Sequence, residues 1–411
     1  TMTPGAGTGT ASSAAAITTG TTLFMAASVS RLRPRTRCVA RVITVPVFVF
    51  VLGLLLWFAA TSSVMRTLVV SRGSSGLNRL KNVALLGCFR SIARRTGSYA
   101  ARDRILTFYA PTAIVSSLLM WLLMYFLAYG MMMWAFSPLS FPTSLREAGS
   151  SLFTLGYATT ERASLTGLDF IAAATGPLAN APLIRYLPTF YAAYQSREAD
   201  ATLLLARGGE PNWAPELIRR HALVRNVDRL DTLWPAWERW AAEVGESHTN
   251  FPVLIQMRSA RPNRNWLISL LCVMDTAAIH MSLNPEQPQG AMRVALRQGI
   301  VCMQELCTVL RIPFDPDPRP DRPTSISLED FLQSCEYMAG GGYTWQRDPT
   351  EAYRHFQGWR ANYEELAYAI ANEIDAVPAP WSGPRIPALP IITPDSQPNR
   401  SPDRPEGTGR A

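Results

Sequence analysis

The chain has 411 residues, of which 48% are hydrophobic, and its formal net charge is +8. This length allows two or three structural units. Apolar residues are dense in the first half, whereas the second half has the composition of a soluble protein. Arginine carries almost all of the positive charge, since Lys81 is the only lysine, a bias typical of a high-GC bacterial genome. The basic residues cluster between apolar segments, which argues against nucleic-acid binding.

The N-terminal region combines a polar segment with the first apolar one. Residues 1–41 are rich in Thr, Ala and Ser, and this composition predicts disorder. Residues 42–60 contain no charged side chain and match the ~20 residues that a membrane helix needs. This run is too long for a cleaved signal peptide and does not end in a clear small-residue cleavage site. We therefore predict a first transmembrane helix over 42–60.

Residues 61–104 form a basic linker in which Asp103 is the single acidic residue. Its basic residues are Arg66, Arg72, Arg79, Lys81, Arg90, Arg94, Arg95, Arg102 and Arg104. Cytoplasmic loops of membrane proteins carry such an excess of Lys and Arg, which attracts anionic headgroups. We predict that the linker is cytoplasmic and touches the anionic headgroups of the lipid bilayer.

Residues 76–95 of this linker have two interpretations. They form either an amphipathic helix at the membrane interface or a solvated connecting helix. In the interfacial case, the side chains that face lipid are Leu77, Leu80, Val83 and Phe89. Those that face headgroups are Arg79, Arg90 and Arg94.

Two more apolar segments follow, over 106–136 and 165–194. The last segment is interrupted by Asp169, Gly176-Pro177, Arg185 and Pro188. With the linker inside, the first of these segments runs outward and the second returns, which places the rest of the chain in the cytoplasm. The N-terminal arginines oppose this orientation, because they would lie outside. The alternatives are that the first segment does not span, or that the true start of the chain lies further along.

The connection between these two segments holds the most informative pattern in the chain. A short amphipathic helix is predicted over 144–153, with Ser144 as N-cap and Glu147 completing a capping box. Thr154-Leu155-Gly156-Tyr157 follows directly. The C-terminus of the helix points at this tetrapeptide, and its partial negative charge favours a cation there.

This order of membrane helix, short helix, T-x-G-Y and membrane helix resembles a bacterial pore-loop potassium channel-like family. Its members have a first helix, a basic cytoplasmic loop, a two-helix pore module and a helical cytoplasmic domain. The resemblance covers about residues 42–382, and T-x-G-Y is its functionally specific part. The other supporting stretches are Leu187-Pro188, Tyr191, Ser196-Arg197-Glu198, Gly208-Gly209-Glu210-Pro211, Trp237-Glu238-Arg239-Trp240, Glu246-Ser247-His248, Phe251-Pro252-Val253-Leu254, Arg258-Ser259, Trp266-Leu267 and Asp275.

The resemblance implies a selectivity filter, in which backbone carbonyls replace the water around a permeant K+ ion. Its residues are Thr154, Leu155, Gly156, Tyr157 and Ala158. One loop cannot surround an ion, so a homotetramer is implied. The family pattern is T-V-G-Y-G, often followed by Asp, whereas this chain has Ala158 and Thr159 at those positions.

An alanine costs ~1 kcal/mol or more where the backbone needs positive φ. If Ala158 is at such a position, the outer end of the filter is distorted, and the sequence does not determine whether the pore selects potassium. In that case Ala158→Gly is expected to raise current or selectivity.

The sequence offers few gating features. Gly176 and Pro177 form either a hinge or a static kink, because Pro removes a backbone hydrogen bond and Gly loosens the helix. Arg185 is expected to extend toward the inner interface. A voltage sensor needs Arg at every third position of an apolar helix, and the first two apolar segments contain no Arg.

The second half predicts a helical bundle, since apolar residues recur at three- and four-residue steps. Helices are expected over 214–224, 230–244, 264–281, 291–310, 328–338 and 349–374. The helix over 264–281 is apolar, but it is short and contains Asp275 and His280, which favours a buried bundle helix. Residues 376–411 are rich in Pro, Arg and Ser, which predicts a disordered tail.

No catalytic or metal-binding pattern stands out in the sequence. The six cysteines contain no C-x-x-C pair, so buried free thiols are expected. Glu246-Ser247-His248 has no nucleophile elbow, phosphate loop or metal spacing beside it, which favours a capping or packing role. We predict no enzyme activity, no cofactor and no nucleic-acid partner.

The sequence thus predicts an all-α membrane protein with three transmembrane helices, a re-entrant pore loop and a soluble α-helical C-terminal bundle. The pore module is expected over 105–195 and the cytoplasmic domain over 196–375. The predicted function is a homotetrameric, potassium channel-like pore that conducts monovalent cations passively across a bacterial plasma membrane. The alternative is a membrane-anchored signalling or scaffold protein whose loop does not conduct, and Ala158 favours it.

Overall fold

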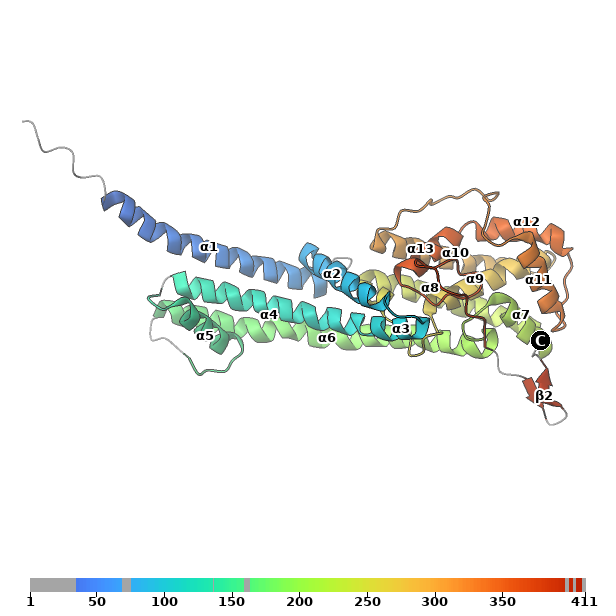
Figure 1. The fold of residues 1–411 in the computed structure, drawn as a ribbon, viewed down its shortest axis with the longest axis horizontal. Helices are drawn as coiled ribbons and strands as arrows, with labels where there is room; N and C mark the ends of the chain where they lie inside the picture. The colour runs from blue at the N-terminus through green and yellow to red at the C-terminus, as the bar shows by residue number, and fades with distance from the viewer. Residues whose placement is uncertain are drawn as a thin grey trace, which may run out of the picture.

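The computed structural model describes residues 35–68, 75–135, 137–158, 163–395, 399–401 and 404–408. The molecule is elongated, with long helices side by side at one end and shorter helices gathered at the other (Figure 1). The elements of the long end are α1 (Arg35–Leu68), α2 (Gly76–Ala93), α3 (Tyr99–Thr107), α4 (Tyr109–Ala135), α5 (Phe141–Leu152) and α6 (Ala163–Gly208). Since α6 has 46 residues, it is about 69 Å long and reaches from this end to the other.

The other end, called the C-terminal cluster below, is formed mainly by helices α7 to α13. Its helices are α7 (Ala214–Leu223), η1 (Val227–Thr232), α8 (Leu233–Asn250), η2 (Pro252–Gln256), α9 (Trp266–Leu283), α10 (Gly290–Leu310), α11 (Leu328–Ala339), α12 (Pro349–Arg360) and α13 (Glu364–Glu373). A short antiparallel pair, β1 (Asn399–Ser401) and β2 (Arg404–Thr408), follows them. The fold is thus almost wholly helical, as predicted.

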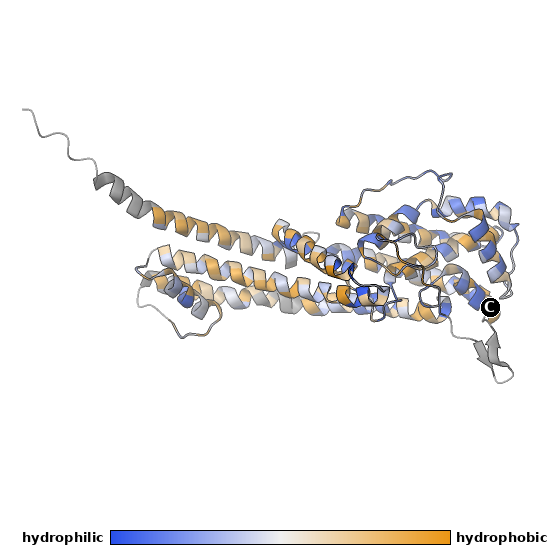
Figure 2. Ribbon diagram, viewed as in Figure 1, coloured by the Kyte–Doolittle hydropathy of each residue, from blue (hydrophilic) through white to orange (hydrophobic). Residues whose placement is uncertain are grey.

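Among the described residues, three helical stretches are long and apolar enough to cross a membrane. They are Val45–Thr67 in α1, Tyr99–Ala135 through α3 and α4, and Trp266–Leu283, which is α9. Figure 2 shows the apolar colouring along α1 and α4. All of α9 is buried inside the C-terminal cluster, whereas most residues of the other two stretches are not buried.

A third span was expected over 165–194. Within the described residues, the apolar part of α6 is Leu165–Ala179. It is shorter than the ~20 residues that a span needs, and the side chains of residues 180 and 182–186, which follow it, lie outside the description. The span over 165–194 therefore stays a prediction.

Helix α1 is fixed to α4 by a row of side-chain hydrogen bonds. The bonds are Trp57 Nε1 to Tyr129 OH (2.8 Å), Thr61 Oγ1 with Tyr125 OH (3.1 Å) and Trp121 Nε1 to Ser63 Oγ (2.9 Å). Hydrogen bonds between helices of this kind add to the van der Waals packing that joins them. Helix α1 is accordingly an integral part of the long end.

The linker helices α2 and α3 dock on the C-terminal cluster through ion pairs. Arg258 donates to Asp103 at 2.7 Å, and both side chains are nearly buried. Arg90 of α2 pairs with Glu373 of α13 at 2.9 Å. These contacts join the segment between α1 and α4 to parts of the C-terminal cluster that follow it by more than a hundred residues.

Several sequence expectations need correction. The single helix expected over 349–374 is two helices, α12 and α13, because the chain turns at Ala361. The tail expected to be disordered is ordered over 376–395, where Val377 is fully buried and the buried Arg385 donates to the carbonyl of Ala376. Helix α1 begins at Arg35, within the segment expected to be disordered, and the rest of that segment lies outside the described residues.

The described cysteines are free thiols, and only Cys88 among them is exposed. Burial raises the pKa of Cys307 and Cys335 to about 12, so the reactive thiolate is scarce at neutral pH. In a Cys38→Ser variant, we expect maleimide to modify one thiol of the native protein and five after unfolding, as counted by mass spectrometry. A second thiol that reacts quickly in the native state would contradict this burial.

Candidate functional site

The short helix predicted between the two apolar segments is α5, and it begins earlier than expected. Ser140 is the N-cap, since its Oγ accepts from the amide of Thr143, and Pro142 occupies the first turn. The predicted N-cap, Ser144, lies inside the helix, where its buried Oγ has no hydrogen-bond partner among the described residues. Serine followed by proline in the first turn is the sequence signal that sets this start.

Helix α5 ends in a Schellman motif formed by the T-L-G-Y segment itself. The amide of Leu155 donates to the carbonyl of Ser150 (2.8 Å), and the amide of Thr154 donates to that of Ser151 (3.0 Å). Thr154 adopts φ 54°, in the left-handed region that β-branched residues rarely enter. The backbone strain of this loop is therefore at Thr154.

The other residues of the predicted filter, Leu155 to Ala158, adopt no regular secondary structure, and the first three of them are exposed. Leu155 and Tyr157 are 63% and 56% exposed. Gly156 has φ 68°, a conformation that glycine adopts without penalty. No described atom lies within 4 Å of a Cβ built at Gly156. The loop thus presents apolar side chains and a glycine that its own subunit does not cover.

The expected strain at Ala158 is not found. Ala158 is not among the residues with positive φ, so glycine is not required there in this conformation. Its amide donates to Ser150 Oγ at 3.0 Å, which ties the end of the loop to α5. Thr159 lies outside the described residues.

Two side-chain contacts hold α5 and the loop in place. The guanidinium of Arg146 lies over the ring of Tyr157, 5.3 Å from its centroid. Ser151 Oγ donates to the Asp169 carboxylate of α6 at 2.6 Å. The polar Asp169 that interrupts the third apolar segment is consequently explained by its bond to the end of α5.

Gly176 and Pro177 lie within an unbroken helix α6. A Cβ at Gly176 would come 2.1 Å from the carbonyl oxygen of Leu152, at the C-terminus of α5. The glycine therefore permits direct backbone packing of α6 on α5. This contact favours the static interpretation of the Gly-Pro pair.

Helix α6 has an apolar outer face that no described residue covers. Phe170 and Leu178 on this face are 72% and 70% exposed. The exposed positions are Gly167, Phe170, Ile171, Ala174, Pro177, Leu178 and Ala181. Their three- and four-residue spacing makes one stripe along the helix, opposite the buried stripe that contains Leu165, Ala172 and Gly176.

Several of the stretches that carry the resemblance beyond the predicted filter meet at one buried arginine. Arg197 in α6 has no exposed side-chain surface. Its guanidinium donates to the carbonyls of Leu254 (2.8 Å) and Met257 (2.9 Å). It also pairs with Glu198 at 2.8 Å and lies over the ring of Trp266. These contacts fix α6 to the C-terminal cluster.

His248 belongs to the same arrangement and has a packing role. Its Nε2 lies 3.0 Å from Nη1 of Arg197. Burial and the Arg197 charge hold the pKa of His248 well below its usual range, so the neutral ring accepts from the arginine. Sequence reasoning missed this arrangement, because the spacing of the stretches along the chain gives no sign that they meet.

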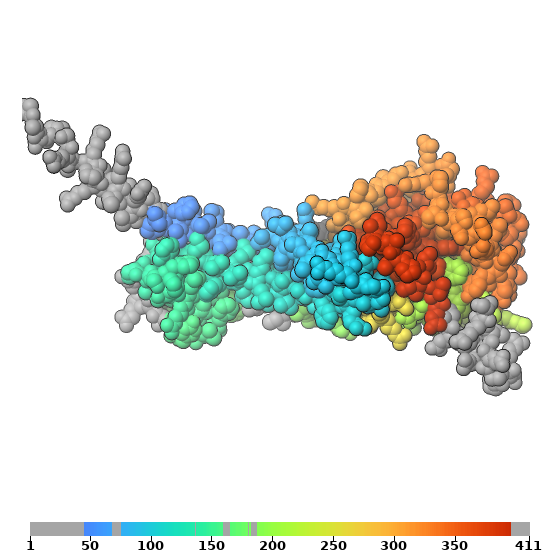
Figure 3. Space-filling model, in the orientation of Figure 1, coloured from blue at the N-terminus to red at the C-terminus, as the bar shows by residue number. Residues whose placement is uncertain are grey.

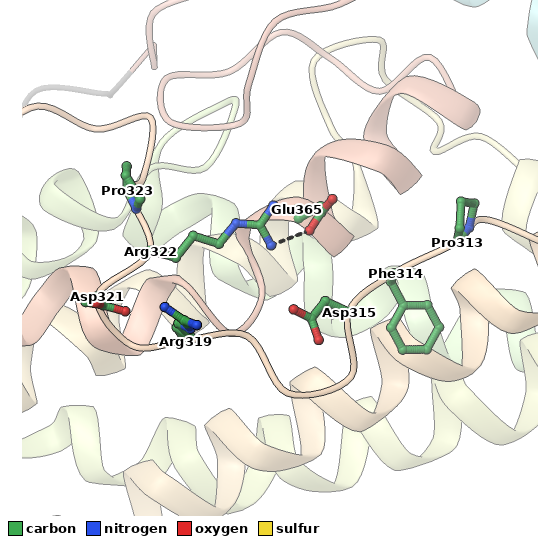
Figure 4. Close-up of a pocket in the computed structure, with 8 residues that line it drawn as sticks. All are labelled: Pro313, Phe314, Asp315, Arg319, Asp321, Arg322, Pro323 and Glu365. Carbon is green, nitrogen blue, oxygen red and sulfur yellow. Dashed lines mark hydrogen bonds and ion pairs between the residues drawn. The ribbon is translucent and has the colours of Figure 1, made fainter.

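A cavity of about 790 Å³ lies beside the loop between α10 and α11 (Figure 4). It is lined by Pro313, Phe314, Asp315, Arg319, Asp321, Arg322, Pro323 and Glu365. Arg322 and Glu365 pair at 2.7 Å, but each is about half exposed. No nucleophile and base meet in it, so this cavity does not suggest catalysis.

Within the described ranges, no group of three His, Cys, Asp or Glu side chains could hold a metal ion. No family model, curated protein or solved structure matches the chain. The geometry of α4, α5 and α6 and the sequence motifs are therefore the features that bear on function.

Proposed function

We propose that the chain is the subunit of a homotetrameric, potassium channel-like pore that conducts monovalent cations. In this proposal the segment after α5 is a re-entrant pore loop, and four copies of residues 154–158 form the filter. The observation that carries the proposal is the exposed T-L-G-Y segment, held between α4 and α6 at the C-terminus of a short helix. Carbonyls and a helix C-terminus at one place favour a cation.

The outer face of α6 supports assembly into an oligomer. Its exposed stripe of small and apolar side chains has no partner among the described residues, and small residues allow helices in membranes to approach closely. The same subunit leaves Leu155 and Tyr157 uncovered. Neighbouring copies arranged around a fourfold axis would cover both surfaces and bring the filter segments together.

The burial of α9 supports the proposed topology. A helix that is buried on all sides within the C-terminal cluster is part of a bundle core, despite its length and apolar composition. We therefore propose that α1, α4 and α6 span the bacterial plasma membrane. The C-terminal cluster is then a soluble cytoplasmic domain, on the same side as the basic linker.

The alternative is a membrane-anchored signalling or scaffold protein whose loop does not conduct. The conformation of Thr154 favours it, because its hydroxyl donates to the preceding carbonyl of Phe153 (2.7 Å) and its φ is strained. Such a loop would need to rearrange before its carbonyls could line a pore. Ion flux separates the two functions.

The test is K+ and Na+ flux through purified protein in liposomes, with assembly state measured in parallel. Gly156→Ala is expected to lower flux about tenfold or more, because alanine at φ 68° costs ~1 kcal/mol in each of four subunits. Gly290→Ala at the start of α10 is the matched control, since this glycine has ordinary φ, has no atom within 4 Å of its Cβ position, and lies outside the proposed filter and subunit interface. An assembled wild-type tetramer without flux would favour the scaffold alternative.

A further inference from the structure

Helix α2 directs large apolar side chains outward as well as inward. Asn78 is buried against the rest of the chain, whereas Leu80 and Val83 are 68% and 62% exposed. Leu77 on the same outer side is 42% exposed. In water, a surface helix directs its polar side chains outward and its apolar ones inward. The outer face of α2, defined as Leu77, Leu80, Val83 and Cys88, therefore fits apolar surroundings.

Hydrogen bonds to α4 fix this orientation. Ser117 Oγ donates to Asn78 Oδ1 at 2.7 Å. Lys81 Nζ donates to the carbonyl of Ala113 (2.7 Å) and to Ser116 Oγ (2.9 Å) and Ser117 Oγ (2.5 Å). Three acceptors satisfy the ammonium group without a carboxylate. Helix α2 cannot rotate to bury Leu80 without breaking these bonds.

The position of α2 places its outer face beside the proposed membrane helices. Ser75, the N-cap of α2, lies 2.6 Å from Ser63 near the end of the apolar stretch of α1. In the space-filling view, the α2–α3 segment lies at the surface in the middle of the molecule (Figure 3). Phe108 and Val115 extend the exposed apolar surface along the adjoining part of the chain.

The charge of residues 75–98 indicates what kind of apolar surroundings cover the outer face of α2. Residues 75–98 contain no acidic side chain, and Arg79, Arg94 and Arg95 are exposed. Apolar side chains interspersed with arginine suit the boundary between the hydrocarbon and anionic headgroups. Arg90 and Phe89, expected to face the membrane, do not: Arg90 pairs with Glu373, and Phe89 packs on Tyr109.

We propose that the outer face of α2 lies in the bilayer boundary and that Arg79, Arg94 and Arg95 bind anionic phosphate headgroups. This proposal depends on membrane insertion of α1 and α4 but not on ion conduction. Because the same linker is joined to the C-terminal cluster through Arg90 and Asp103, headgroup binding would hold that cluster against the membrane.

Cys88 provides a reporter on this face, because it is exposed while the other described cysteines are buried. A Cys38→Ser variant is labelled with an environment-sensitive fluorophore and reconstituted into phosphatidylcholine vesicles with and without phosphatidylglycerol. We expect spin-labelled lipid to quench the fluorescence of the label and aqueous iodide to leave that fluorescence unchanged. Quenching by iodide alone would show a solvated helix and overturn the proposal. Protection from both quenchers would show cover by a second copy and would also overturn it.

The charge requirement is tested by the response of the same fluorophore to phosphatidylglycerol. Removing one arginine near the surface weakens binding by about fivefold. Arg94→Gln should therefore raise the phosphatidylglycerol fraction needed for half of the spectral shift by about that factor. Arg297→Gln is the matched control, since Arg297 is exposed on α10 in the C-terminal cluster. An equal response of the two variants would rule out headgroup binding by Arg94.

Discussion

Gly176→Ala is expected to destabilise the protein and, if the chain forms the proposed pore, to remove its cation flux, although alanine is the better helix former. The new Cβ would lie 2.1 Å from the carbonyl oxygen of Leu152, a backbone atom that cannot move without α5. Overpacking of this kind costs about 1–3 kcal/mol, and more where the backbone must shift. Alanine gains at most ~1 kcal/mol in helix propensity. The clash therefore outweighs the gain in helix propensity, so the net effect on stability is unfavourable. It also displaces α5, the helix that precedes the proposed filter.

The control for this change is a glycine in the C-terminal cluster. Gly290→Ala adds the same methyl group to α10 at an exposed position with no atom within 4 Å, so it should be neutral or slightly stabilising. Thermal unfolding of both variants, followed by tryptophan fluorescence in the same lipid nanodiscs, compares them directly. Equal midpoints for the two would mean that α6 and α5 do not touch at Gly176 in the native protein.

Gly176 also marks the limit of what the sequence predicts about the pore module. The order of helix, short helix, T-L-G-Y and helix was predicted correctly from apolar runs and capping residues. The packing of Gly176 on Leu152 was not, because a Gly-Pro pair has the same composition in a hinge and in a close contact. The start of α5 was misplaced at Ser144, because a capping-box spacing competes with the Ser-Phe-Pro signal at Ser140.

In the C-terminal cluster, too, the sequence predicts helices but not the buried contacts between them. The helix expected over 214–224 is observed over Ala214–Leu223, since periodicity records which face is buried. The buried arginines were not predicted. A charged side chain is buried only where acceptors from other segments meet it, and for Arg197 these come from η2 and its flank.

The partners of Asp275 account for the stable burial of the apolar helix α9 inside this cluster. Its carboxylate is fully buried and accepts from Arg360 of α12 and from the hydroxyl of Tyr363 (2.7 Å). Burial raises the pKa of Asp275, and the adjacent Arg360 charge opposes that shift. A helix with a carboxylate at its centre is stable in the core because the arginine and the tyrosine satisfy it.

Arg360→Met is expected to lower the free energy of unfolding by about 3–5 kcal/mol, because it leaves Asp275 buried without its cation. Arg322→Gln is the control. Arg322 pairs with Glu365 at 2.7 Å, but both groups are about half exposed, so the loss should be about 0–1 kcal/mol. Urea unfolding of the two variants measures the difference, and equal losses would contradict a buried ion pair.

The pH dependence of the Arg360→Met variant separates loss of charge from loss of packing. Without Arg360 the pKa of Asp275 rises further, so over the interval above the unfolded-state value of about 3.9 the native state binds a proton that the unfolded state releases. The variant should then gain stability relative to wild type as the pH falls through this interval. Adding Asp275→Asn should recover part of the loss at neutral pH, because the buried group becomes neutral. A deficit that is independent of pH and unchanged by Asp275→Asn would instead assign the effect to the packing of the Arg360 side chain.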